Sequence, residues 1–176
     1  MILTIGHSTH PIDEFLQMLA AHGVEQLIDV RTIPKSRRNP QFQQENLAAS
    51  LEHSHIGYQH MPGLGGLRHA RKDSINTGWK NASFRGYADY MQTPGFVESL
   101  RQLINAAEDR RAVIMCAEAV PWRCHRSLIA DALAARGIVV EHILSKTSRK
   151  QHAYTPFARI EDERVTYPGL PKLNRD

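Results

Sequence analysis

The sequence contains only two cysteines among 176 residues, Cys116 and Cys124, and both lie in one short segment. Small secreted domains usually carry several disulfide pairs that are spread along the chain. We therefore predict that both cysteines are unpaired thiols in a reducing compartment and that the protein is cytoplasmic.

Long apolar runs are also missing from the sequence. No segment approaches the roughly 20 apolar residues of a membrane-spanning helix, and residues 1–8 lack the basic and apolar regions of a signal peptide. We expect no membrane partner.

The two cysteines lack the short spacing of zinc ligands and no paired histidine motif follows them, so the sequence predicts no metal and no organic cofactor.

The excess of positive charge is small, because 22 lysines and arginines face 18 acidic residues and give a net charge of +4. This excess is compatible with a phosphate-bearing partner but does not require nucleic acid. The hydrophobic share of 41% and the charged share of 23% are ordinary for a globular protein. The length predicts one domain over residues 1–176, with an irregular tail from about residue 145.

Short apolar runs alternate with amphipathic stretches along the chain. The runs at residues 1–5, 24–30, 56–61, 112–116 and 138–143 predict five strands. Helical periodicity begins at Pro11 and after Asn39-Pro40, and it covers residues 84–91, 94–107 and 124–136. This alternation predicts an α/β fold, a mostly parallel five-stranded sheet with helices on both faces in Rossmann-like or rhodanese-like layering. Residues 157–160 and 164–167 are expected to form a small C-terminal hairpin.

Polar side chains follow three of the predicted strands. His7 follows the first strand, Asp29 and Arg31 end the second, and residues 116–127 follow the fourth. The carboxyl ends of parallel strands share one sheet edge, so these residues should converge on one pocket.

The segment after the fourth strand combines Glu118, Arg123, Cys124, His125 and Arg126. The arginines and the start of the following helix predict an anion site, because both favour negative charge. Glu118 is a candidate general acid or base, and the surroundings of Cys124 favour its thiolate. The alternatives are arginines that are solvated or paired locally and cysteines that act as small buried apolar residues.

Two basic stretches, residues 35–38 and 68–72, offer another interpretation. They could follow a phosphate backbone, which would make the protein a non-catalytic nucleic-acid-binding module. The second stretch lies in a long loop over residues 62–83, and loops of this length are often functional.

Several motifs together resemble the domain-of-unknown-function 488 family. They are Thr4-Ile5-Gly6-His7-Ser8, Leu27-Ile28-Asp29-Val30-Arg31, Ser36-Arg37-Arg38-Asn39-Pro40-Gln41-Phe42, Leu64-Gly65-Gly66, the run at residues 84–91, and Met115-Cys116-Ala117-Glu118 through Cys124-His125-Arg126. The resemblance extends to residues 155–158 and 166–168. It implies a site on His7, Asp29, Arg31, Arg37, Asn39, Glu118, Cys124, His125 and Arg126, without naming a substrate.

A fainter likeness is to rhodanese-like and cysteine-phosphatase domains, where a strand ending in cysteine leads into a phosphate-binding loop. Those loops place five residues between the cysteine and the arginine. Here six residues separate Cys116 from Arg123, and Trp122 stands at the expected position. Sulfur or phosphoryl transfer is therefore the second alternative function.

The leading prediction is an anion-binding, enzyme-like domain whose ligand is a nucleotide, a nucleic acid or another phosphate-bearing molecule. The oligomeric state and the reaction are left open. The candidate catalytic residues are Glu118, Cys124, His7 and Asp29, and the candidate ligand-binding residues are Arg31, Arg37, Asn39, Arg123, His125 and Arg126.

Overall fold

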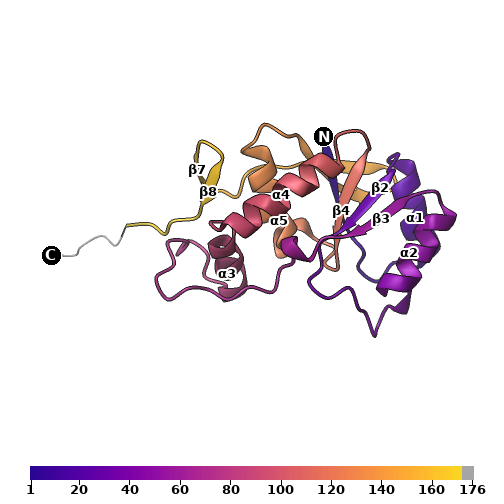
Figure 1. Cartoon of the computed structure of the whole chain (residues 1–176), viewed down its shortest axis with the longest axis horizontal. Coiled ribbons are helices and arrows are strands. Elements are labelled where there is room, and N and C mark those ends of the chain that lie inside the picture. Colours follow the sequence, from indigo (N-terminus) through magenta and orange to yellow (C-terminus); the bar gives the residue numbers. More distant parts are fainter. Residues whose placement is uncertain (172–176) are drawn as a thin grey trace.

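A six-stranded sheet forms the centre of the computed structural model, which describes residues 1–171 (Figure 1). The sheet order is β3-β2-β4-β1-β5-β6, and the first five of these strands are parallel. The strands are β1 (Ile2–Gly6), β2 (Gln26–Asp29), β3 (Gly57–His60), β4 (Ala112–Cys116), β5 (Val140–Ser145) and β6 (Ser148–Gln151). The five predicted parallel strands are confirmed.

The sixth strand corrects the prediction of an irregular tail. β6 pairs antiparallel with β5, and all four of its residues are exposed. Its sequence, Ser-Arg-Lys-Gln, has no apolar alternation, because an edge strand can be held by backbone hydrogen bonds alone. The predicted hairpin is confirmed as β7 (Arg159–Glu161) and β8 (Arg164–Thr166).

Helices cover both faces of the sheet, as Figure 1 shows. One face carries α1 (Ile12–Ala21) and α2 (Gln44–His53), whose apolar side chains pack with Leu3 and Val113. The other carries α3 (Ala82–Tyr90), α4 (Pro94–Ala106) and α5 (Arg126–Ala134), which pack with Ile28 and Ile114. None of the helices within residues 1–171 has the length and apolar character to span a membrane.

Two helix starts differ from the predictions, and a proline is the cause in both cases. Pro40 begins a short 3-10 turn, η1 (Pro40–Phe42), so α2 starts only at Gln44. Pro121 begins a second turn, η3 (Pro121–Arg123), so α5 starts at Arg126 and not at Cys124. Proline fits the first position of such turns because it has no backbone N–H to leave unpaired.

The connections of β1 and β4 open a crevice between these two neighbouring strands. β1 leads through α1 to β2, whereas β4 leads through α5 to β5, and the two helices lie on opposite faces of the sheet. The chain therefore leaves adjacent strands in opposite directions. This arrangement is a topological switch point, where open α/β sheets usually bind their ligands.

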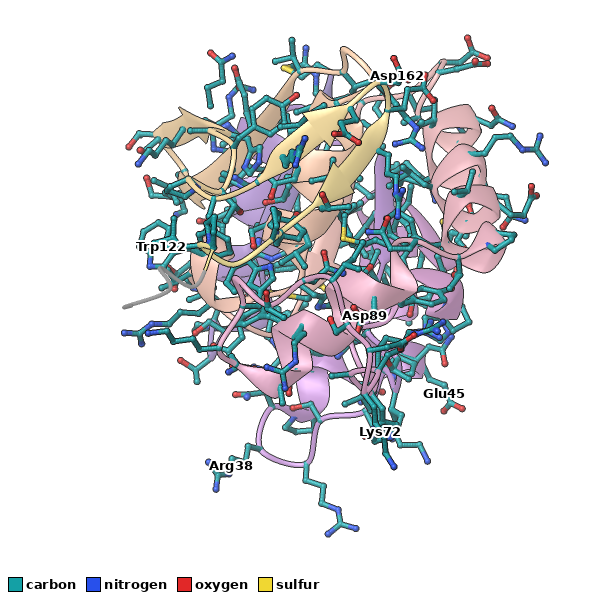
Figure 2. All side chains as sticks on the ribbon, turned by 90° about the vertical axis from the view of Figure 1, so that its left-hand side faces the viewer. Arg38, Glu45, Lys72, Asp89, Trp122 and Asp162 are labelled. Atoms are coloured by element: carbon teal, nitrogen blue, oxygen red, sulfur yellow. A yellow bond between two sulfur atoms is a disulfide. The ribbon has the colours of Figure 1, made fainter. Side chains whose placement is uncertain are left out.

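The long loop over residues 62–83 is ordered by Asp89 of α3, a buried residue labelled in Figure 2. Its carboxylate accepts hydrogen bonds from the Arg71 backbone at 2.8 Å, the Ser74 hydroxyl at 2.6 Å and the Asn76 amide at 2.8 Å. The loop begins with the turn η2 (Pro62–Leu64) and returns toward the switch point. The loop over residues 62–83 is therefore held in a fixed position beside the switch point.

Candidate functional site

A pocket of about 1010 Å³ opens at the switch point, at the carboxyl ends of β1, β2 and β4. Its lining holds five cationic side chains and, among the described residues, one carboxylate, that of Glu118. We call it the basic pocket. Its cations are Arg31, Lys35, Arg37, Arg38 and Arg123.

Eight of the ten predicted site residues line this pocket, although they come from distant parts of the sequence. Asp29 and Arg126 do not line it, and both are fully buried. The eight lining residues are His7, Arg31, Arg37, Asn39, Glu118, Arg123, Cys124 and His125.

Asp29 lies beneath the pocket and holds Arg31 in place. The Arg31 guanidinium donates to both carboxylate oxygens, at 2.9 and 2.7 Å, and the Tyr58 hydroxyl donates to one of them at 2.7 Å. Burial, the main cause, and this carboxylate together raise the pKa of Tyr58. Because its oxygens are already engaged, Asp29 is suited to positioning Arg31 rather than to proton transfer.

His7 is a neutral side chain at the rim of the crevice. Burial, the main cause, lowers its pKa from 6.5 to about 4. Its Nδ1 lies 2.8 Å from the Ser8 carbonyl oxygen, which only accepts, so Nδ1 carries the proton and Nε2 faces Arg31. Its ring stacks on Phe42 at 4.2 Å. His7 Nε2 carries no proton and accepts from the Arg31 guanidinium at 3.4 Å.

The residue that follows, Ser8, has a left-handed backbone with a φ of 46°. A non-glycine residue in this region is uncommon and carries conformational strain, which often marks functional sites. Ser8 lines the basic pocket, and its N–H donates to the Ala117 carbonyl at 2.9 Å. This backbone hydrogen bond joins the segment after β1 directly to the loop after β4.

Arg126 supports the loop after β4 from below. Its guanidinium donates to the carbonyl oxygens of Glu118 at 2.6 Å and Ala119 at 3.4 Å. Gly6 allows the loop after β4 to lie close to the end of β1, because a Cβ at position 6 would overlap the Glu118 carbonyl. Within residues 1–171, the backbone N–H groups of residues 117–120 donate to no protein acceptor. They remain available to a ligand.

A chain of buried hydrogen bonds, here called the buried relay, extends from Arg126 away from the pocket. Arg126 donates to Thr4 Oγ1 at 3.2 Å, which contacts His142 Nδ1 at 2.7 Å. His142 Nε2 lies 3.0 Å from His152 Nδ1, and His152 Nε2 lies 2.8 Å from Asp131. The carboxylate only accepts and the guanidinium only donates, so Arg126 donates at one end of the relay and His152 Nε2 donates to Asp131 at the other. Both ring nitrogens of each histidine are engaged.

The two cysteines correct the prediction of unpaired thiols, because the structure joins their sulfur atoms. The physical reason is η3, which turns the chain back so that Cys124 returns to the end of β4. Both residues line the basic pocket.

His125 lies next to this pair of cysteines. The His125 Nε2 donates to the Val30 carbonyl at 3.1 Å, and the His125 Nδ1 lies 3.6 Å from the Cys124 sulfur. Burial, the main cause, lowers the pKa of His125 to about 4.

Comparison with known proteins adds the family. The sequence matches the family described as Domain of unknown function DUF488 over residues 11–133, more than half of the chain. The chain belongs to this family. No curated protein and no solved structure matches it. The DUF488 match includes the loops after β2 and β4, whereas β1 and His7 precede it.

Residues at the start of α3 also line the pocket of this DUF488 chain, and the sequence interpretation missed them. Asn81 caps the helix by accepting from the Ser83 and Phe84 backbone N–H groups, and all three residues face the pocket. The asparagine before the helical run is a recognisable capping signal. Its place in the site could not be read locally, because it depends on the path of the loop over residues 62–83.

The second basic stretch does not join the first at the pocket. Arg68 lies over the Tyr90 ring at 3.5 Å, and Arg71 pairs with Asp73 at 2.9 Å. Neither residue lines the basic pocket. Within residues 1–171, no group of three histidine, cysteine or acidic side chains is arranged to hold a metal ion.

Proposed function

We propose that the basic pocket is an enzyme-like site that binds a phosphate-bearing ligand, a nucleotide or a nucleic acid. The observation that carries the proposal is the ratio of five cations to one carboxylate in the lining. Phosphate carries the negative charge that such a surface attracts, and arginine side chains can hold it with paired hydrogen bonds.

Most of these cations have no acidic partner to neutralise them. Within residues 1–171, Lys35, Arg37, Arg38 and Arg123 form no salt bridge, whereas Arg101 on α4 pairs with Glu98 at 2.7 Å. Figure 2 shows Arg38 projecting away from the ribbon. The unengaged backbone N–H groups of residues 117–120 add donors at the same crevice. A row of such amides forms a concave anion site.

Glu118 gives this site a group for chemistry. Its carboxylate is exposed and lines the pocket beside Arg123 and Cys124. A carboxylate that reaches a bound ligand can act as a general acid or base, while the cations stabilise charge on the phosphate. Neutral His7 would orient the ligand through Arg31, because its Nε2 accepts from this guanidinium and Arg31 lines the pocket.

Salt-dependent binding tests the proposal. A single-stranded oligonucleotide should bind less tightly as salt rises, and the double variant Arg37→Ala/Arg123→Ala should reduce the logarithmic salt slope by about 1.4, or ~0.7 per lost phosphate contact. The matched control is Arg101→Ala, which removes an exposed arginine on α4. Binding that is absent for nucleotides and oligonucleotides, or reduced equally by Arg101→Ala, would overturn the proposal.

The same experiment separates an enzyme from a non-catalytic binding module. If the site is enzymatic, Glu118→Gln should retain the bound nucleotide or strand but lose its chemical conversion. Mass spectrometry of the ligand after incubation measures that conversion. Strands and nucleotides that bind and stay unchanged with the wild-type protein would favour the module.

A second candidate function is cysteine-dependent sulfur transfer, which the joined sulfurs at the pocket wall favour. In this reaction the Cys116 thiolate takes the outer sulfur of thiosulfate and releases sulfite. The Cys124 thiolate then attacks the inner sulfur of the persulfide, which forms the Cys116–Cys124 disulfide and releases hydrosulfide. A dithiol reductant restores both thiols. Sulfite release that persists in Cys116→Ser would exclude this candidate.

A further inference from the structure

A second pocket, of about 260 Å³, lies on the opposite side of η3 from the basic pocket. Aromatic rings from three separate segments line it, together with the ammonium-bearing side chain of Lys150. We call it the aromatic pocket. Its rings are those of Trp79, Trp122, Tyr154 and Phe157.

Three of these rings are exposed to an unusual extent. The exposed fraction is 63% for Trp122, 41% for Tyr154 and 38% for Phe157. Large aromatic side chains gathered at one exposed site are typical of ligand or partner surfaces, because their apolar area is costly to leave in water. Figure 2 shows Trp122 at the edge of the molecule.

The inner wall of the aromatic pocket is fixed before any ligand binds. Trp79 stacks on Phe84 at 4.9 Å and meets the edge of Phe157 at 4.8 Å. Its indole Nε1 is buried and has no acceptor among the described residues. A buried donor without a partner is unfavourable, and an acceptor brought to it by a ligand would relieve this cost.

The two histidines of the aromatic pocket, His142 and His152, have their ring nitrogens engaged in the buried relay. Burial, the main cause, lowers the pKa of His142 to about 3. Both rings therefore contribute flat surface to the pocket. Flat surfaces with few free polar groups suit a planar ligand that stacks.

The aromatic pocket and the basic pocket share the η3 wall. Val120 and Arg123 line the basic pocket, whereas Pro121 and Trp122, between them in sequence, line the aromatic pocket. Arg123 and Trp122 are both exposed on this wall. The Phe84–Trp79 stack bridges the two pockets in the same way, because Phe84 lines the first and Trp79 the second.

We infer that the aromatic pocket stacks a nucleobase of the ligand whose phosphate occupies the basic pocket. The inference rests on the proposed function for its phosphate half. Every base has a planar face that stacks on aromatic rings, and base edges carry acceptors for a free indole N–H. Lys150 adds positive charge near a nucleic-acid strand that would cross the η3 wall between the two pockets.

The test compares ligands that contain the base, the phosphate or both. The probes are adenosine, its monophosphate, a short single-stranded oligonucleotide, and the same oligonucleotide with abasic sites. Trp122→Ala should weaken binding of the base-containing oligonucleotide by roughly ten-fold or more and leave the abasic strand unchanged. Trp122→Phe should restore most of the loss, because it keeps a stacking surface. Arg123→Ala should weaken the binding of both the base-containing and the abasic oligonucleotide.

The two tryptophans give a direct readout of the pocket, since their two indole N–H signals in a nuclear magnetic resonance spectrum report Trp79 and Trp122. Adenosine alone should shift both signals, which would support the base site even if every phosphate probe failed. Unchanged signals with adenosine and the base-containing oligonucleotide would overturn the inference. Equal binding of base-containing and abasic strands would also overturn it, while leaving the phosphate site intact.

Discussion

The basic pocket and the buried relay use the same kinds of residue in opposite ways. In the relay, each polar side chain from Thr4 to Asp131 meets a partner within 3.2 Å, and Asp131 also accepts from Tyr167 and Thr155 at 2.7 Å. In the basic pocket, four cations have no acidic partner among the described residues. Extensive hydrogen bonding marks residues that hold the fold, and in the relay the buried Nε of Arg126 is the group without a partner among the described residues. Unengaged charge marks residues that are available to a ligand.

Arg126 belongs to both regions and shows why sequence position alone misleads. It lies in the segment that supplies the pocket, yet it is fully buried and donates to Thr4 and to two loop carbonyls. Burial, its main cause, lowers the pKa of Arg126 to about 10, so the side chain remains charged at neutral pH. The carboxylate whose charge acts on Arg126 is that of Glu118, whereas Asp131 lies at the other end of the relay.

The largest expected effect is on the relay. Asp131→Ala should lower the free energy of unfolding by about 3–5 kcal/mol, because it leaves the buried donors of His152, Thr155 and Tyr167 without their acceptor. Denaturant unfolding followed by circular dichroism measures the loss. The matched control, Asp73→Ala, removes an exposed carboxylate that pairs with Arg71 and should leave the free energy of unfolding nearly unchanged. Equal losses in the two variants would contradict the contrast between buried and exposed charge.

An intermediate effect is expected from acidification. Burial lowers the pKa values of His7 and His125 to about 4 and that of His142 to about 3, whereas an unfolded histidine has a pKa of 6.5. Between these values the unfolded chain binds more protons, so stability is retained above pH 6.5 and falls as the pH drops toward 4.

Unfolding free energies measured from pH 7.5 to pH 4.5 check this dependence. Each pKa difference of one corresponds to about 1.4 kcal/mol at full effect, so the three histidines together should produce a clear decline. His142→Gln removes one titrating group and should flatten the curve in part. A stability that stays constant across this range would show that the histidines are not neutral in the folded protein.

The smallest effect is expected in the basic pocket. Glu118→Ala should change the free energy of unfolding by less than about 0.5 kcal/mol, or raise it slightly, because exposed functional side chains contribute little to stability. Thermal unfolding measures the change. Severe destabilisation would mean that Glu118 is a structural residue like Asp131.

The central parallel strands could be predicted because their residues are buried on both faces of the sheet. β1 and β4 are buried at every position, so their apolar runs are visible in the sequence. β6 could not be predicted, because four exposed polar residues form it through backbone pairing with β5.

The site residues also differ in how far their roles could be predicted from the sequence. The grouping of His7, Arg31 and Glu118 follows from strand polarity, which the sequence pattern contains. The roles of Asp29 and Arg126 depend on which hydrogen bonds are already made, and the cysteine pairing depends on the η3 turn. Such contacts arise from tertiary structure and have no local sequence signal.

The position of β1 has a consequence for how the protein folds. The first strand of the chain lies inside the sheet, between β4 and β5, and Thr4 meets His142 across 138 residues of sequence. Contacts of this separation slow folding, because a long loop must close before they form. During synthesis, residues 2–6 emerge before residues 112–145 and lack their sheet partners until these follow. The crevice therefore takes shape only after residue 116 has been made, and shorter chains leave the apolar strand at residues 2–6 exposed.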